Sequence, residues 1–172
     1  MAEERKQRMT ATAAAAKIPK MVRANFTANL KAKEEGRPVA FSFIVNCYDE
    51  ILRAMDIVPA WAESYSGICA AKHDAGRFLE KAESQNFSRS LCTYATCGLG
   101  FEYWRNELGG EMPPNAPWGG IARPDFILGT GQMLCDPRYK WPQAVQHYMK
   151  DVPAYIGGFY WPPYDENMDH RE

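Results

Sequence analysis

Three of the five cysteines, Cys69, Cys92 and Cys135, each follow a predicted strand or turn at the point where a predicted helix begins. In an open α/β sheet, such junctions gather along one edge and form a ligand-binding crevice. Widely spaced thiolates that meet there can bind one soft metal centre. The cysteine positions therefore indicate a metal site, although a free cysteine is most often a small buried hydrophobic residue.

Zinc and an iron–sulfur cluster are the two metal centres to compare. Structural zinc sites usually take closely spaced cysteine pairs, whereas the only short spacing here joins Cys92 and Cys97, with no histidine nearby. Cluster ligands need not be close in sequence. Cys92 and Cys135 lie at predicted helix starts, where backbone amides stabilise negative charge. The pattern favours an iron–sulfur cluster over a zinc ribbon.

A dinucleotide site is a weaker alternative. Gly129-Thr130-Gly131 follows a predicted strand, as the first glycines of the dinucleotide fingerprint do. Leu134 occupies the third glycine position, and no acidic residue follows at the required spacing. A plain tight turn explains the two glycines without a cofactor.

A nucleophilic Cys/His pair is the last alternative. His73 lies four residues after Cys69 on the same predicted helix face. Its neighbours Lys72 and Asp74 indicate a solvated position, which argues against a protease or an acyl transferase.

These residues must be positioned by helices and strands that alternate along the chain. The spacing of apolar residues predicts helices over 3–35, 50–55, 66–83, 91–107 and 137–150, and strands over 39–45, 57–60, 125–130 and 152–157. Asp49 is placed to cap the second helix. Gly98 and Gly100 predict a kink or an early end in the helix over 91–107. A long surface loop is expected over 109–124.

Alternating strands and helices predict parallel β-α-β units with right-handed crossovers. We therefore expect an α/β fold, a Rossmann-like or flavodoxin-like three-layer domain with a mainly parallel sheet and a long N-terminal helix. We divide the chain into an N-terminal helical segment over 1–37 and a Rossmann-like α/β domain over 38–172.

The composition excludes several classes of protein. The chain has 172 residues, which suits one domain, and its 46% hydrophobic content excludes intrinsic disorder. A net charge of -1 gives no electrostatic sign of a nucleic-acid or lipid partner. The sequence shows neither a secretory signal nor an apolar run that could span a membrane. We expect a cytoplasmic protein with reduced cysteines.

Five segments together are similar to one known family. Three of them resemble the 2-hydroxyacyl-CoA dehydratase and benzoyl-CoA reductase family, and more closely its 2-hydroxyglutaryl-CoA dehydratase D-component group: Pro59–Lys72, Phe87–Ala95 and Asp125–Trp141. Two more resemble the part of the family that leads into its first strand and helix, namely Lys33–Val39 and Asp49–Ala54. The resemblance extends from about Phe26 to Asp165, and the order and spacing of the segments make it specific.

The resemblance implies an oxygen-sensitive 4Fe-4S protein with Rossmann-like domains, usually a heterodimer. It implies three partners: an acyl-CoA substrate, a second subunit, and a separate ATP-hydrolysing activase that donates one electron. In dehydratases the electron makes a ketyl radical of the CoA thioester, which expels the hydroxyl group. In benzoyl-CoA reductases the electron begins reduction of the ring.

The resemblance also implies roles for individual residues. Cys92 lies in a Cys-Thr-Tyr that matches the family's Cys-Ser-Tyr and is the foremost cluster ligand, followed by Cys69 and then Cys135. Glu63 matches the acidic position of the family's Pro-Glu-Asn and is the candidate catalytic residue beside the cluster or the thioester. An exposed carboxylate at a helix start is the alternative for Glu63. The last two cysteines, Cys47 and Cys97, are expected to be core or supporting thiols.

This sequence also departs from the family pattern. Family subunits are more than twice as long and contain a second Rossmann-like half, which is expected to supply a ligand. Ala62 and Ser64 replace the family's proline and asparagine. We therefore expect only the N-terminal half of a subunit that reductively processes a CoA thioester. The alternative is a non-catalytic α/β subunit or scaffold that docks onto a larger reductase or dehydratase.

Overall fold

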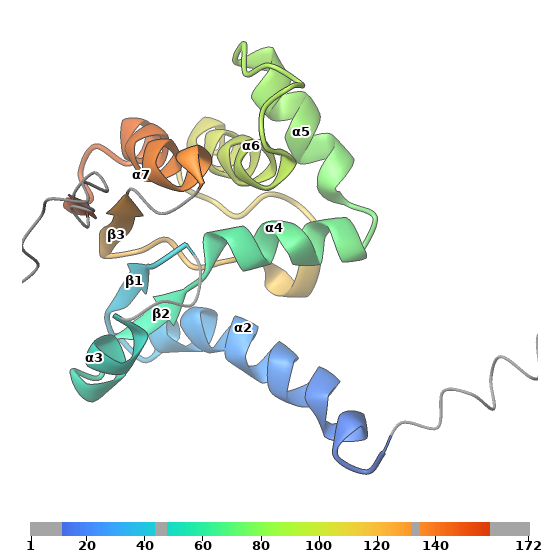
Figure 1. The fold of residues 1–172 in the computed structure, drawn as a ribbon, viewed down its shortest axis with the longest axis vertical. Coiled ribbons are helices and arrows are strands. Elements are labelled where there is room, and N and C mark those ends of the chain that lie inside the picture. The colour runs from blue at the N-terminus through green and yellow to red at the C-terminus, as the bar shows by residue number, and fades with distance from the viewer. Residues whose placement is uncertain (1–11, 44–47, 132–134, 159–172) are drawn as a thin grey trace, which may run out of the picture.

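Four parallel strands form the centre of the computed structural model, which describes residues 12–43, 48–131 and 135–158 (Figure 1). The strands are β1 (Val39–Phe41), β2 (Val58–Ala60), β3 (Phe126–Gly131) and β4 (Ala154–Gly158). Their order in the sheet is β2-β1-β3-β4, and every neighbouring pair is parallel. The predicted α/β fold with a parallel sheet is therefore confirmed.

The central strand β1 consists of residues that suit a sheet covered on both faces. Val39, Ala40 and Phe41 are completely buried, and all three are apolar. A short apolar run of this kind is typical of strands in parallel sheets, which carry helices on both sides. Phe41 aligns with Ala60 of β2 on one side and with Ile127 of β3 on the other.

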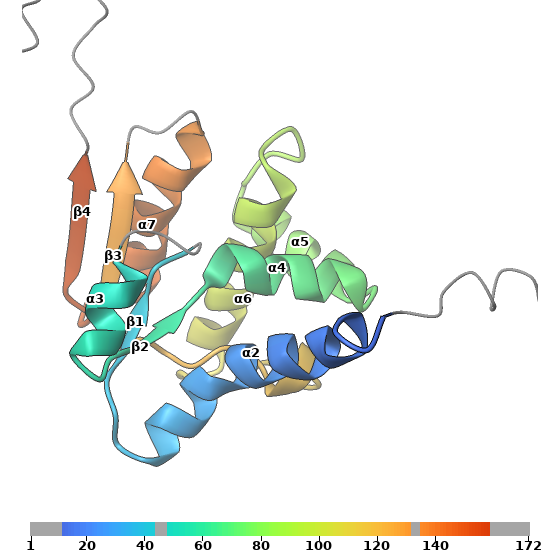
Figure 2. The same cartoon turned by 60° about the horizontal axis from the view of Figure 1, so that its bottom comes forward.

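Helices cover both faces of this sheet. The helical elements are η1 (Ala15–Lys17), α2 (Ile18–Glu34), α3 (Asp49–Ala54), α4 (Ala62–Ala71), α5 (Ala75–Ser84), α6 (Thr93–Glu107), η2 (Pro117–Gly119) and α7 (Asp136–Tyr148). Figures 1 and 2 show α6 and α7 on one side of the strands and α2 and α3 on the other. This arrangement gives the predicted three layers, with the predicted long helix at the N-terminal side.

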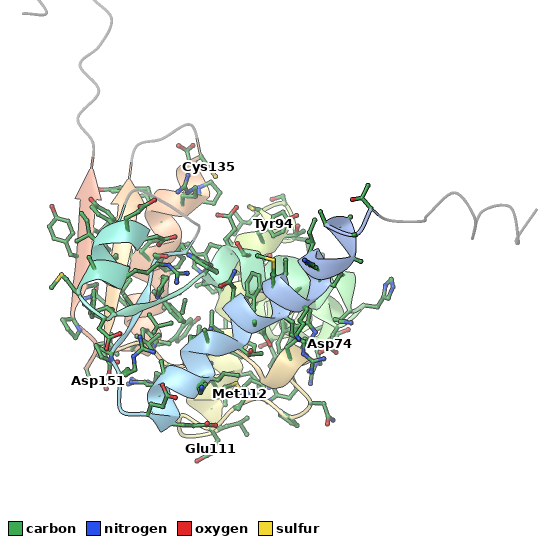
Figure 3. All side chains as sticks on the ribbon, turned by 90° about the horizontal axis from the view of Figure 1, so that it is seen from below. Asp74, Tyr94, Glu111, Met112, Cys135 and Asp151 are labelled. Carbon is green, nitrogen blue, oxygen red and sulfur yellow. The ribbon has the colours of Figure 1, made fainter. Side chains whose placement is uncertain are left out.

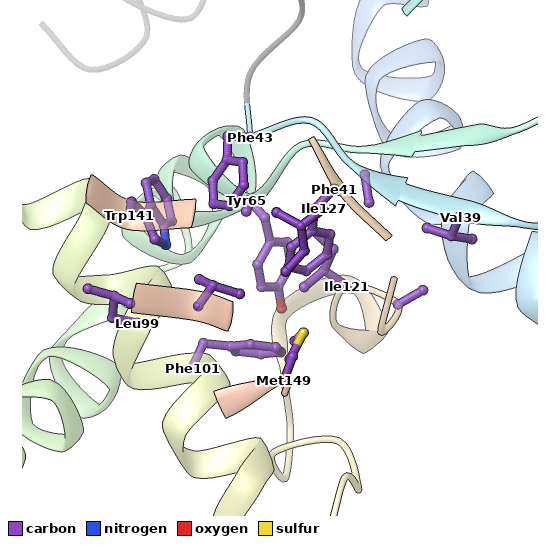
Figure 4. Packing of buried hydrophobic residues seen from close by; sticks show 14 of the residues in the cluster. Val39, Phe41, Phe43, Tyr65, Leu99, Phe101, Ile121, Ile127, Trp141 and Met149 are labelled. Atoms are coloured by element: carbon purple, nitrogen blue, oxygen red, sulfur yellow. The ribbon is translucent and has the colours of Figure 1, made fainter. Parts of the chain in front are cut away.

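The main core lies between the sheet and the helices α4, α6 and α7 (Figure 4). Aromatic rings dominate it and meet edge to face. The ring of Phe43 lies 5.2 Å from that of Trp141, and Tyr65 and Phe101 are 5.3 Å apart. This packing attaches α4, α6 and α7 to the sheet, and so it fixes where each of these helices begins.

The single helix predicted over 66–83 is wrong, because the chain breaks between α4 and α5. His73 adopts a left-handed backbone conformation with φ of 57°. The N–H of Asp74 donates to the carbonyl of Cys69 at 2.8 Å, and the N–H of His73 donates to that of Ala70 at 2.9 Å. These two bonds form a Schellman-type helix end, which usually takes glycine at the left-handed position.

The kink or early end predicted at Gly98 and Gly100 is also wrong, because α6 is continuous from Thr93 to Glu107. Both glycines lie where another element approaches closely. A Cβ atom on Gly98 would lie 2.1 Å from the ring of Trp141 in α7, and one on Gly100 would lie 1.8 Å from the carbonyl oxygen of Phe78 in α5. The glycines therefore allow helices to pack instead of ending one.

Three further predictions need correction or lie outside the described residues. Asp49 does not cap α3 but is its first residue, and its side chain is buried. The strand β1 ends at Phe41 because Phe43 adopts a left-handed φ of 58°. The rest of the predicted strand from residue 44, and residues 3–11 of the predicted N-terminal helix, lie outside the described residues.

In the part of the chain that the structure describes, no helix is both long enough and apolar enough to cross a membrane.

Candidate functional site

The candidate site lies at the edge of the sheet where the parallel strands end. Ligands of open α/β sheets bind at this carboxyl edge, at the point where the chain turns to opposite sides of a strand. Here that point lies between β1 and β3, because β2 was added on one side of β1 and β3 on the other. Figure 3 shows Cys135 and Tyr94 toward the end to which the strands point, with Glu111, Met112 and Asp151 toward the opposite end.

Cys92 and Cys135 are the residues that immediately precede α6 and α7. Neither helix start has a hydrogen bond from a capping side chain. The first backbone N–H groups of a helix have no partner within it, so these two starts favour negative charge. Cys92 is half-buried and Cys135 is exposed. Thiolates are the usual ligands of iron–sulfur clusters, and these two accessible cysteines suit that chemistry.

Glu63 lies in the first turn of α4, directly after β2. Its backbone N–H donates to the carbonyl oxygen of Phe43 at 2.8 Å, which links the chain after β2 to the chain after β1. Its side-chain atom Oε2 is buried and has no hydrogen-bond partner among the described residues. A buried carboxylate oxygen without a partner is costly, which makes Glu63 the polar group at this edge most in need of a ligand.

Asp49 is a part of this edge that sequence reasoning missed. Its carboxylate accepts hydrogen bonds from Trp61 Nε1 at 2.9 Å and from Ser42 Oγ at 3.2 Å. Asp49 therefore joins the residues that follow β1 and β2, close to where Glu63 enters α4. The sequence offered only the helix-start position of this aspartate, which is equally typical of an N-cap.

Cys69 lies in the second half of α4 and not at a helix start, so that part of its prediction is wrong. Its side chain is 1% exposed, and Cys97 of α6 is 2% exposed beside it. Hydrogen bonding to Cys97 and burial raise the pKa of the Cys69 thiol, which opposes the thiolate form that metal ions bind. The expectation that Cys97 is a core thiol is confirmed.

Among residues 12–43, 48–131 and 135–158, no group of three or more His, Cys, Asp or Glu side chains is placed to hold a metal ion. Cys69, Cys92 and Cys135 are thus not gathered into such a set there. Cys47 lies outside the described residues. Ligation by the three predicted cysteines stays a prediction.

The two alternative sites find little geometric basis. Gly129 to Gly131 lie within β3 and not in a turn, and a Cβ atom on Gly129 would lie 2.9 Å from Pro142 of α7. The close approach of a helix explains this glycine. His73 is exposed beyond the end of α4, whereas Cys69 is buried, so the two do not share a helix face.

A buried ion pair near the opposite end of the sheet was not foreseen either. Glu102 and Arg105 of α6 are both almost fully buried, with 3.2 Å between Oε2 and Nη1. Burial raises the pKa of Glu102 and lowers the pKa of Arg105, while each acts against the shift of the other. Arg105 also donates to the carbonyl oxygen of Ile121. The spacing of three residues on one helix was the only sequence signal for this pair.

Comparisons with known proteins agree on one family. The family described as 2-hydroxyglutaryl-CoA dehydratase, D-component, matches residues 45–164. The chain is 32% identical over 123 residues to the (R)-2-hydroxyisocaproyl-CoA dehydratase alpha subunit of Clostridioides difficile. It is 27% identical over 128 residues to the (R)-phenyllactyl-CoA dehydratase alpha subunit of Clostridium sporogenes.

These alignments cover most of this chain but a smaller part of each relative. They include 72% and 74% of the chain, against 27% and 28% of the two relatives. The chain therefore spans about a quarter of the length of the relatives it matches.

Proposed function

Because the chain belongs to the 2-hydroxyglutaryl-CoA dehydratase D-component family, we propose that it is the iron–sulfur component of a 2-hydroxyacyl-CoA dehydratase. In this proposal it takes part in the one-electron reduction of a CoA thioester in the cytoplasm. A second subunit and an ATP-hydrolysing activase are its partners. Both relatives are named as dehydratases, which favours dehydration over the ring reduction of benzoyl-CoA reductases.

The observation that carries this proposal is the position of Cys92 and Cys135 directly before α6 and α7. In the proposal these two thiolates hold a 4Fe-4S cluster. The backbone N–H groups at the two helix starts donate to its sulfides and stabilise its negative charge. When bound, the cluster supplies electrons one at a time to the thioester. The remaining ligands come from outside the described residues.

Glu63 has the second role in this proposal. Its partnerless Oε2 takes either the cluster or the thioester as its missing partner. The bond from its N–H to Phe43 keeps the start of α4 in place for that role. Ligation by Cys69 is not part of this core proposal, because its thiol is buried beside Cys97. All four described cysteines are free, in keeping with a reducing compartment.

Iron and sulfide per chain, measured after anaerobic purification, test the proposal. We expect Cys92→Ser and Cys135→Ser to lose most of the iron, because a serine oxygen is a poorer ligand for the cluster than a thiolate. Cys97→Ser is the matched control in the core. It should keep its iron while losing about 1 to 2 kcal/mol of unfolding free energy, because it buries a hydroxyl group.

The outcome for Cys69→Ser decides the sequence prediction for that residue. Loss of iron with an unchanged fold would add Cys69 to the ligands, and retention of iron would leave it as a core thiol. If Cys92→Ser holds as much iron as the parent chain, the cluster assignment fails. The non-catalytic subunit or scaffold then becomes the better explanation.

A further inference from the structure

The helix α2 is packed along only part of its length. Its C-terminal half is attached to the body, where Asn29 and Ala32 are buried. The ring of Phe26 lies 5.8 Å from Trp61 and 5.9 Å from Trp118. Figure 1 shows the helix continuing past these contacts, with its N-terminal end away from the strands. The first two turns therefore extend beyond the part that the core holds.

The same face of α2 stays apolar over those first two turns. Ile18, Val22 and Phe26 follow one another at spacings of four, so they lie on one side of the helix. The described chain leaves this side uncovered at its beginning, since Ile18 is 56% exposed, Met21 62% and Val22 38%. Scattered exposed apolar residues are ordinary, but a row that continues a buried stripe indicates an interaction surface.

Basic residues border this row. Lys17, Lys20 and Arg23 are exposed, and none of them forms an ion pair with another described residue. The sequence of α2 has no acidic residue before Glu34, at its other end. The exposed end thus combines an apolar row with positive charge alone.

We propose that this surface, the α2 stripe, is a docking site for an apolar groove with an acidic rim on the second subunit. The α2 stripe consists of Ile18, Met21, Val22, Lys17, Lys20 and Arg23. The inference rests on the proposed function for the existence of that subunit. Charge complementarity selects the partner, because an acidic rim pairs with three cations that have no described partner.

A second copy of this chain and a membrane fit the α2 stripe less well. Two copies that met through the stripe would place three positive charges against three others, which opposes association. Binding to a membrane grows with the apolar area that enters it. The stripe offers only three aliphatic side chains, and the nearest aromatic ring, Phe26, already packs against Trp61 and Trp118.

Met21→Glu in the full chain tests the proposal, with Met55→Glu as its matched control. Met55 of the α3 end is 65% exposed, close to the 62% of Met21, but lies away from α2 and beside Asp56. Each variant is purified anaerobically and titrated with the second dehydratase subunit from the same genome. We expect Met21→Glu to weaken binding about tenfold or more and Met55→Glu to leave it unchanged. Binding by the parent chain should also weaken as salt rises.

Several results would overturn the proposal. They are equal binding by Met21→Glu and the parent, absence of any complex, loss of self-association in Met21→Glu, and parent binding to phosphatidylglycerol vesicles that Met21→Glu abolishes. Iron content is measured on the same samples. Normal iron with unaffected binding by Met21→Glu rejects the docking site alone, whereas absence of iron from the parent chain rejects the proposed function.

Discussion

At the scale of single residues, Gly100 shows how packing outweighs helix propensity. Alanine is favoured over glycine in a helix by about 1 kcal/mol, yet the added methyl group would lie 1.8 Å from the backbone oxygen of Phe78. Backbone atoms cannot move aside cheaply, and overpacking costs roughly 1 to 3 kcal/mol. We expect Gly100→Ala to lower the free energy of unfolding by about that amount, measured by urea denaturation.

Gly76→Ala is the control for this prediction. Gly76 lies in the first turn of α5, and no neighbouring atom lies within 4 Å of the position that an added methyl group would take. This variant should be as stable as the parent or slightly more stable, since only propensity changes. A stable Gly100→Ala variant would contradict the close contact between α5 and α6.

The sequence predicted single residues well where local position decides and poorly where distant neighbours decide. Cys92 and Cys135 were expected at helix starts and are found there, because turn residues and apolar spacing mark those starts locally. The proximity of Cys69 and Cys97 depends on how α4 packs against α6, which no local pattern contains. The glycines of α6 were misjudged for the same reason.

At the scale of elements, Arg77 holds a long loop against the corner between α4 and α5. Its guanidinium donates to the carbonyl oxygen of Pro114 at 2.5 Å, to that of Asn115 at 3.1 Å and to Asp74 at 2.5 Å. It also lies over the rings of Phe78 and Trp104. Lysine has a single ammonium and cannot span these acceptors. Arg77→Lys should therefore lower the free energy of unfolding by about 1 to 2 kcal/mol in urea denaturation.

Arg89→Lys provides the comparison on the same helix pair. Arg89 is 83% exposed and bonds only to Glu83 among the described residues, at 2.7 Å. Replacing it should produce no measurable change, because an exposed ion pair contributes little. Equal effects of the two replacements would show that the Arg77 bonds do not hold the loop.

The element boundaries show why some breaks could be predicted and others could not. The end of α5 before Asn86 was expected from the Asn-Phe-Ser sequence, and the helix does end at Ser84. The break after Ala71 has neither glycine nor proline to mark it, and His73 takes the left-handed position that glycine usually occupies. Apolar periodicity continued through this break, so a single helix was expected.

At the scale of the whole molecule, α2 is attached to the sheet through polar contacts between distant segments. Asn29 Oδ1 accepts the N–H of Ala122 at 2.7 Å, just before β3. Asp125 accepts a bond from Lys33 at the end of α2 and another from the N–H of Val39 in β1. The layered fold was predictable from alternation alone, but these contacts were not. The boundary placed between residues 37 and 38 stays a prediction.

Asp125 makes this attachment sensitive to acid. Partial burial acts to raise the pKa of Asp125, but the bonds from Lys33 and from the N–H of Val39 outweigh it and lower the pKa below its usual value. A carboxylate with a lowered pKa stabilises the folded state fully above its unfolded pKa, near about 4, and loses that contribution as pH falls through the folded value. Asp125→Asn should therefore be less stable than the parent near neutral pH.

That difference in stability should shrink below about pH 4, because the parent then loses the charge that the variant never had. Urea midpoints of both proteins, followed by circular dichroism from neutral pH down to about pH 3, measure it. Lys33→Met should remove part of the same contribution, and the double variant should lose less than the sum of the two single losses, because the residues share one bond. A constant difference between parent and Asp125→Asn at every pH would mean that the shape of Asp125, and not its charge, attaches α2 and β1 to the start of β3.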